Sequence, residues 1–197
     1  SFFPTKNITT TEGGMLTTNN KKYYLEIKKL IAHGINKDRK KFFWHRVADL
    51  PGHNFRLPNH LAALGNSQLK KLNKFNLMRR SIAKKYNNFF SKMPNFFEVQ
   101  EVKKKYTHSY QMYSVLVKKN KRNSLLYFLK KKGVDASVHF DPPLHKQAYL
   151  KKYSKKLKFT EKLSQQILTL PIYPDLSQKN LSFILNKIND WYNLINK

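Results

Sequence analysis

The first fourteen residues, SFFPTKNITTTEGG, carry the side chain best suited to covalent chemistry. Lys6 follows a proline-fixed turn and precedes a run of threonines. A lysine amine forms a Schiff base with a carbonyl when a positive neighbour or a dry pocket lowers its pKa. Ser1 and Thr5 add short hydroxyl groups suited to a phosphate. The chain has 39 Lys and Arg residues, so the local pattern alone does not separate a reactive lysine from a solvated one.

Histidines offer a second kind of chemistry. His139 lies on an expected strand, and His145 and Asp141 follow within a few residues. A third histidine or a carboxylate at ligand spacing is missing, so the sequence predicts no metal site. The chain has no cysteine, which excludes disulfides and thiolate metal centres and favours a cytoplasmic location.

The charge is strongly positive. The 197 residues have a formal net charge of +28, with 40% hydrophobic and 14% aromatic residues. The hydrophobic content predicts a folded core rather than wholesale disorder. The lysines occur in short groups beside apolar residues, which indicates solvated faces, although such a charge also attracts polyanions. The sequence lacks the run of about 20 apolar residues that a membrane span needs.

Apolar spacing predicts the elements of the first part. Residues 13–18 form a short strand, and residues 19–34 form a helix with Asn19 or Asn20 as its cap and Gly34 at its end. Residues 36–55 are irregular and aromatic. A long helix covers residues 58–89, and its length of about 45 Å exceeds what one small core needs. We therefore expect it to bridge two domains, residues 1–70 and residues 71–197.

The pattern changes after Pro94. It predicts strands at residues 109–117 and 134–140, a helix at 122–133 that Gly133 closes, and an extended segment at 168–173. A terminal helix follows Ser177, its expected cap, with apolar residues facing inward. Strands mixed with helices in this order predict a compact α+β unit.

The N-terminal segment resembles the one that carries the Schiff-base lysine in DegT/StrS-type sugar aminotransferases, which are pyridoxal-phosphate enzymes of the aspartate-aminotransferase fold. The matching residues are Ser1, Phe2, Lys6, Asn7, Glu12, Gly13 and Gly14. Thr11 stands where the family commonly has glycine. The segments GHNFRLPNHLAALGNSQLKKL, GVDASVHFDPPLHKQAYLKKY and LTLPIYPDLSQKNLSFIL resemble further family motifs in the family's order. Asn59 replaces a residue that is usually acidic.

The resemblance implies an α/β fold. Residues 1–70 would be the C-terminal part of the large, cofactor-binding domain and the start of the bridging helix, and residues 71–197 the small α+β domain. Family members have a longer N-terminal part that supplies the ring-stacking residue, the acid paired with the pyridine nitrogen and the phosphate loop. We therefore expect this chain to be a C-terminal fragment that is inactive by itself.

The resemblance also assigns roles. Lys6 would be the catalytic lysine that anchors pyridoxal 5'-phosphate, and Ser1 would bind the cofactor phosphate. Asn54 would reach the cofactor phosphate of the neighbouring subunit in a homodimer. Arg56 would meet an anionic donor or a sugar-nucleotide phosphate, and His139 would line the substrate entrance.

These roles describe an aminotransferase that converts a nucleotide-linked keto sugar to an amino sugar, with glutamate as amino donor. Lys6 argues against the branch of the family that has histidine at this position and acts as dehydratases. The alternative is a catalytically inert basic binding module that contacts nucleic acid or an anionic surface. The coding sequence upstream of Ser1 discriminates between them, because an in-frame cofactor domain supports the enzyme.

Overall fold

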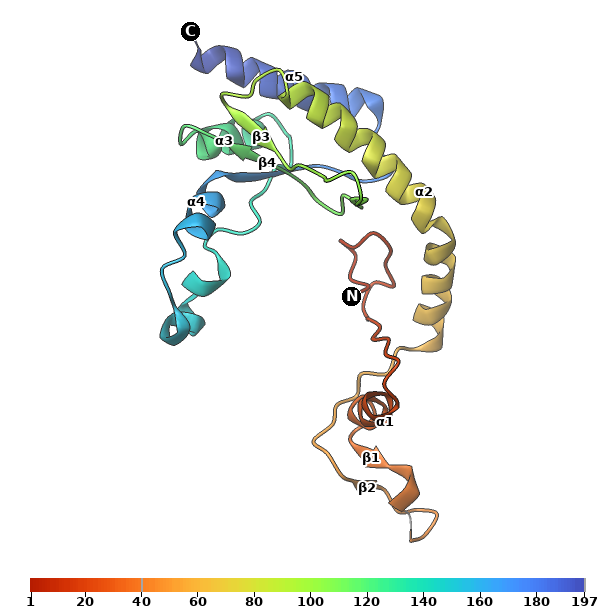
Figure 1. The fold of residues 1–197 in the computed structure, drawn as a ribbon. Helices are drawn as coiled ribbons and strands as arrows, with labels where there is room; N and C mark the ends of the chain where they lie inside the picture. The colour runs from red at the N-terminus through yellow and green to blue at the C-terminus, as the bar shows by residue number, and fades with distance from the viewer. Residues whose placement is uncertain (40, 197) are drawn as a thin grey trace. The chain divides into compact units, whose positions relative to one another are not determined.

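The computed structural model describes residues 1–39 and 41–196. The chain forms two compact units, Ser1–Leu72 and Asn73–Lys197, which are described separately below. Helix α2 (Asn59–Phe90) gives its first part to one unit and the rest to the other (Figure 1). In the described part of the chain, none of the helices combines the length and the apolar character needed to span a bilayer.

The first unit contains the predicted helix, α1 (Lys21–Leu30). The side chain of Asn20 accepts hydrogen bonds from the backbone N–H groups of Lys22 and Tyr23, which confirms it as the N-cap. At the other end Gly34 has φ +71°, and its N–H donates to the carbonyl of Lys29 at 2.8 Å. Glycine adopts this left-handed conformation without a steric penalty, so the helix ends here.

Two departures from the prediction occur in the first unit. Residues 13–18 form no strand, because they join no β-ladder in the described ranges, and Met15 and Leu16 remain exposed. The segment predicted to be irregular contains an antiparallel hairpin of β1 (Ile35–Asn36) and β2 (Val47–Ala48), with the short helix η1 (Lys37–Arg39) after β1.

The second unit is built on a three-stranded antiparallel sheet in the order β3 (Phe97–Val99), β4 (Tyr113–Val117) and β5 (Ile167–Leu170). Val115 pairs with Val99 on one side and with Leu168 on the other. Burial alternates along β4, and its inward side chains are Tyr113, Val115 and Val117. One face of the sheet is therefore apolar and needs a cover.

Helices supply that cover. Helices α3 (Arg122–Lys131) and α5 (Gln178–Ile195) contact each other and lie side by side in Figure 1. Their buried side chains join those of the second half of α2 in one core with the sheet. The largest fully buried members are Tyr86, Phe90, Leu125, Leu129, Leu181, Ile188 and Trp191. The second unit thus has its own hydrophobic core.

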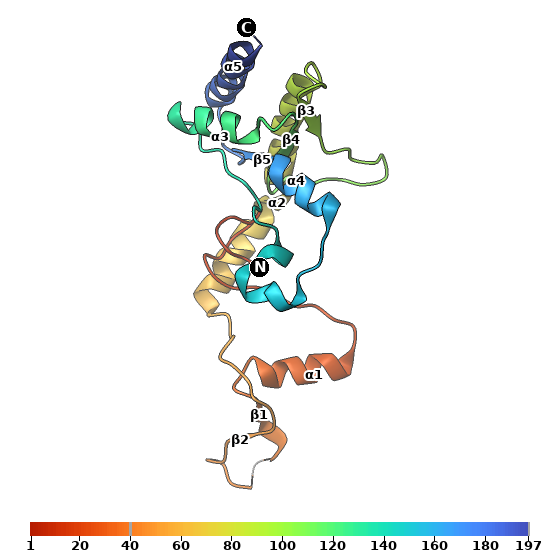
Figure 2. The same ribbon diagram turned by 90° about the vertical axis from the view of Figure 1, so that its left-hand side faces the viewer.

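The terminal helix confirms its prediction, since the Ser177 hydroxyl accepts from the N–H of Asn180 at 3.1 Å. The strand predicted at residues 134–140 is wrong. Ser137 alone pairs with Thr169, as an isolated bridge, and the segment then leaves the sheet. Helix α4 (Lys158–Gln166) and the 3-10 turns η2 (Leu144–Lys146) and η3 (Ala148–Tyr153) were not predicted; Figure 2 shows α4 close to β5.

Candidate active-site loop and the motif beside it

Residues 1–14 form a closed loop. The N–H of Phe2 donates to the carbonyl of Gly13 at 2.9 Å, and the N–H of Thr10 donates to the carbonyl of Phe2 at 3.0 Å. Inside this closure, the N–H of Lys6 donates to the carbonyl of Phe3 at 3.0 Å and makes a turn. The Lys6 side chain is exposed, and in the described part of the chain its ammonium makes no hydrogen bond or ion pair. The loop therefore holds Lys6 on a hydrogen-bonded backbone with its side chain exposed.

The return half of this loop has an unusual backbone. Thr11 has φ +68° and Gly13 has φ +124°. The hydroxyl of Thr9 accepts from the N–H of Thr11 at 2.8 Å, and the hydroxyl of Thr10 donates to the carbonyl of Glu12 at 2.5 Å. A left-handed conformation at Thr11 is one that favours glycine. This chain has threonine at a position whose backbone conformation favours glycine.

The loop packs against the beginning of α2. Thr10 is only 1% exposed. A Cβ on Gly65 would lie 3.0 Å from Cγ2 of Thr10, and a Cβ on Gly13 would lie 2.7 Å from Cδ1 of Leu57. The two glycines leave room for this close approach. The lysine loop and the segment around Leu57, which directly follows Arg56, therefore pack together within the first unit.

The Gly-x-Asn-x-Arg motif at residues 52–56 is held by the end of α1. The N–H of His53 donates to the carbonyl of Leu30 at 2.7 Å, and the N–H of His33 donates to the carbonyl of His53 at 2.9 Å. A Cβ on Gly52 would lie 2.1 Å from the backbone nitrogen of Gly34. Backbone meets backbone at this crossing, so the first position of the motif requires glycine.

The polar side chains of the motif face each other. Nε of Arg56 donates to Oδ1 of Asn54 at 3.1 Å, and both residues are exposed. The rings of His53 and Phe55 stack with centroids 4.7 Å apart. The contact between Nε of Arg56 and Asn54 leaves the other guanidinium nitrogens as donors for an anion.

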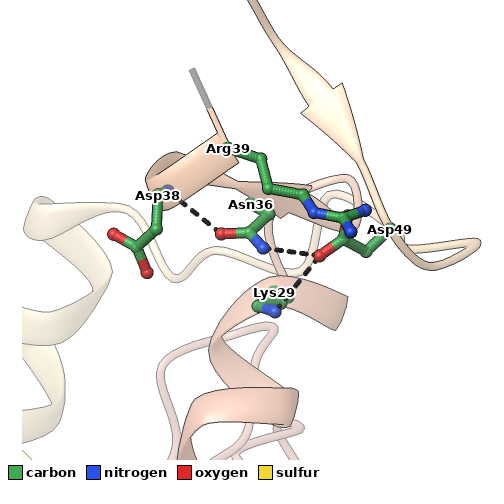
Figure 3. Close-up of polar contacts among 5 residues, drawn as sticks. All are labelled: Lys29, Asn36, Asp38, Arg39 and Asp49. Atoms are coloured by element: carbon green, nitrogen blue, oxygen red, sulfur yellow. Dashed lines mark hydrogen bonds and ion pairs between the residues drawn. The ribbon is translucent and has the colours of Figure 1, made fainter. Parts of the chain in front are cut away.

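Asp49 anchors the hairpin that precedes the motif (Figure 3). Its carboxylate accepts from Nδ2 of Asn36 at 2.6 Å, from Nζ of Lys29 at 3.3 Å and from Arg39 at 3.2 Å. The N–H of Asp49 donates to the carbonyl of Gly34 at 3.0 Å. The hydrogen bond from Asn36, followed by the two cations, lowers the pKa of Asp49 below its ordinary value. This ionised carboxylate ties both strands to α1.

His139 lies in the second unit. Its Nδ1 is 3.1 Å from the hydroxyl of Thr169 and 3.4 Å from the hydroxyl of Ser137, and its side chain is half-buried. The ring meets that of Phe140 edge to face, with centroids 5.1 Å apart. These contacts attach His139 to the edge of β5, so its ring has a fixed position within its own unit.

Arg122 positions the same segment and was not singled out from the sequence. It is 5% exposed, and its guanidinium donates to Oδ2 of Asp141 at 2.6 Å and to the carbonyls of Ser164 and Ile167 at 3.2 and 3.3 Å. The sequence signal that could have identified Arg122 is a charged residue on the apolar face of a helix, which it shares with Leu125 and Leu129. Arg122 joins the turn after His139 to the end of α4 and the start of β5.

The lysine loop and the adjoining motif fit a phosphate-bearing aldehyde. Oγ of Ser1 accepts from the N–H of Phe3 at 3.3 Å, so its own proton remains available for a phosphate oxygen. Lys6 follows on the same ordered loop. For a metal the described residues offer no group of three His, Asp or Glu side chains, and His145 instead pairs with Glu161 at 3.2 Å.

Comparison with known proteins agrees with these features. The sequence profile of the DegT/DnrJ/EryC1/StrS aminotransferase family matches residues 1–189. The uncharacterized protein MJ1066 of Methanocaldococcus jannaschii is 33% identical over 95% of this chain and 52% of its own length. The GDP-perosamine synthase of Escherichia coli O157:H7 is 32% identical over 98% of this chain and 50% of its own length.

Solved structures show the same relationship. Helicobacter pylori PseC, an aminotransferase involved in the biosynthesis of pseudoaminic acid, superposes with a TM-score of 0.87 at 28% identity. The match covers 98% of this chain and 52% of that chain. The chain thus spans about half the length of the proteins that it matches. Because the profile covers nearly all of the sequence, the chain belongs to the DegT/DnrJ/EryC1/StrS aminotransferase family.

Proposed function

We propose that the polypeptide carrying this chain is an aminotransferase that converts a nucleotide-linked keto sugar to an amino sugar, with glutamate as amino donor. The family match and the relatives GDP-perosamine synthase and PseC support a sugar substrate. The observation that carries the proposal is the exposed Lys6 on an ordered loop that packs beside the Gly-x-Asn-x-Arg motif.

The cofactor of the proposal is pyridoxal 5'-phosphate, on which aminotransferases of this family depend. When bound, this group supplies the electron sink that lets an amino group pass from donor to acceptor. Lys6 would hold the cofactor covalently through its amine. Once the amino donor has released this amine, Lys6 would act as the base and then the acid that transfers a proton from one carbon atom to another. Ser1 would donate its hydroxyl proton to a phosphate oxygen.

Asn54 and Arg56 would serve the neighbouring subunit of a homodimer. Both side chains are exposed, and their mutual hydrogen bond uses only Nε of the Arg56 guanidinium, so the other nitrogens can bind an anion. Asn54 would bind the partner's cofactor phosphate, and Arg56 would bind the carboxylate of the donor or a phosphate of the sugar nucleotide. A two-fold interface supplies both sites with the same pair. His139 would line the substrate entrance.

The test uses the complete gene product that contains this chain. With glutamate and a nucleotide-linked keto sugar, the wild-type protein should form 2-oxoglutarate and the amino sugar. Lys6→Ala should lower the rate by about a thousandfold or more, because the covalent anchor and the proton carrier are lost together.

The matched control is Lys21→Ala, which removes another exposed lysine of the same unit and should leave the rate unchanged. An active Lys6→Ala variant, or an equal loss in both variants, would contradict the assignment.

A further inference from the structure

A cavity in the second unit is lined by none of the residues assigned above. Its volume is about 350 Å³, near the lower end of small-molecule sites. The second half of α2 forms one wall, and the chain between β3 and β4 forms the other. The lining residues used below are Arg80, Lys84, Asn87, Thr107, His108 and Tyr110. None of them belongs to the proposed aminotransferase site.

The helical wall is positively charged without compensation. Arg80 and Lys84 are one turn apart, and neither side chain has an ion pair in the described part of the chain. The 32 residues of α2 include no Asp or Glu. The residues that line the cavity include no carboxylate, and Glu101 lines an adjoining hollow that shares Thr107 and His108 with it.

The other groups in the lining are arranged as hydrogen-bond donors. Nδ1 of His108 accepts from the N–H of Tyr110 at 2.8 Å, so the neutral ring carries its proton on Nε2. Oδ1 of Asn87 accepts from the buried hydroxyl of Tyr113 at 2.7 Å, which leaves the amide NH₂ for a ligand. The hydroxyl of Thr107 adds another donor. The wall is therefore rich in donors and cations, which is the chemistry that binds an oxyanion.

The loop wall is held in one shape. Tyr110 has φ +47°, a left-handed conformation that side chains other than glycine rarely adopt. Its N–H bond to His108 stabilises this turn, and the two rings lie with centroids 4.2 Å apart. Backbone strain of this kind is concentrated at binding sites, where packing maintains it. The aromatic rings also give a planar group a surface on which to stack.

We propose that this cavity binds the phosphate group of a small phosphorylated molecule that carries a planar ring, such as a nucleoside monophosphate. Arg80 and Lys84 would hold the phosphate charge, and Asn87, Thr107 and His108 would donate to its oxygens. Tyr110 would contact the ring. This proposed phosphate site is independent of the proposed aminotransferase activity, and its test does not depend on that activity.

The test is calorimetric titration of the 197-residue chain with uridine monophosphate, with inorganic phosphate and with uridine. The titrations use 150 mM salt, about the physiological ionic strength, because this screens long-range charge effects. The double variant Arg80→Gln/Lys84→Gln should bind uridine monophosphate at least about tenfold more weakly, because two charge-assisted contacts are lost. The matched control, Lys70→Gln/Lys74→Gln, removes two charges with the same spacing from the same helix and should bind like the wild type.

Imidazole NMR gives a second reading that does not depend on these variants. Uridine monophosphate should shift the His108 resonances and leave those of His33 in the first unit in place. Phosphate alone should bind more weakly than uridine monophosphate, and uridine should not bind. Equal weakening in both double variants, an unshifted His108, or the absence of saturable binding would overturn the proposal.

Discussion

Thr11 occupies a backbone conformation that favours glycine. Its φ of +68° places a β-branched side chain in a conformation that costs about 1 to 2 kcal/mol. Thr11→Gly should therefore raise the free energy of unfolding by about 1 kcal/mol, after allowance for the greater freedom of glycine in the unfolded chain. Urea denaturation measures the change. Thr17→Gly, at a residue without a positive φ, should instead lower stability, and the same loss at both positions would contradict this account.

Arg122 offers a second test at the scale of a residue. Its buried guanidinium joins Asp141 to two backbone carbonyls, so Arg122→Ala leaves these partners unpaired and should cost about 3 kcal/mol. Lys130→Ala is the control, because Lys130 also pairs with an aspartate, Asp135, at 3.0 Å but is exposed. The control should cost less than about 1 kcal/mol. Similar urea midpoints for the two variants would exclude Arg122 as the anchor of this segment.

The candidate residues could be identified from the sequence, but the residues that pack around them could not. Lys6 and the Gly-x-Asn-x-Arg motif are recognisable because their spacing matches the family. The packing of Thr10 against Gly65 is not visible in the sequence, because it joins positions 55 residues apart through the absence of a side chain. Arg122 was missed for a related reason, since its partners lie in segments far along the chain that only the fold brings together.

Helices α1, α2, α3 and α5 lie near the residues where helices were predicted, because apolar periodicity and caps act locally. Strands β4 and β5 overlap the extended segments predicted at residues 109–117 and 168–173, whereas β1, β2 and β3 were not predicted. Strand β3 has three residues and depends on its neighbour β4, so it leaves little pattern of its own. Residues 134–140 have a strand-like composition, but only Ser137 pairs with a neighbouring strand. Tertiary contacts, which the composition does not reveal, determine how much of such a segment joins a sheet.

The hairpin of β1 and β2 should respond to acid through Asp49. Its folded pKa lies below the ordinary value, so the stabilisation is present above the unfolded pKa of about 3.9 and is lost as the pH falls through the folded pKa. Hydrogen exchange of the Asp49 N–H, corrected for its intrinsic rate, should lose protection below about pH 4. Asp49→Asn should show weaker protection that does not change over this range. An identical pH profile in the variant would show that another group controls the hairpin.

At the scale of the whole molecule, the proposed homodimer predicts complementation between two inactive variants. If Asn54 serves the neighbouring site, a heterodimer of Lys6→Ala and Asn54→Ala subunits contains one site with both residues intact. Mixing the two complete proteins under conditions of subunit exchange should therefore restore activity, whereas each variant alone stays inactive. A mixture as inactive as its components would place Asn54 and Lys6 in the same subunit's site, and an active monomer in sedimentation would contradict the dimer.

If Lys6 carries the cofactor, covalent labelling should find the cofactor on this side chain. The complete gene product is incubated with pyridoxal 5'-phosphate, reduced with borohydride to fix the Schiff base, digested, and mapped by mass spectrometry. We expect one pyridoxyl group on the peptide that contains Lys6. Prior treatment with glutamate should remove the label, because the cofactor is then in its amine form. A stoichiometric label on any other of the chain's lysines, with Lys6 unmodified, would contradict the account.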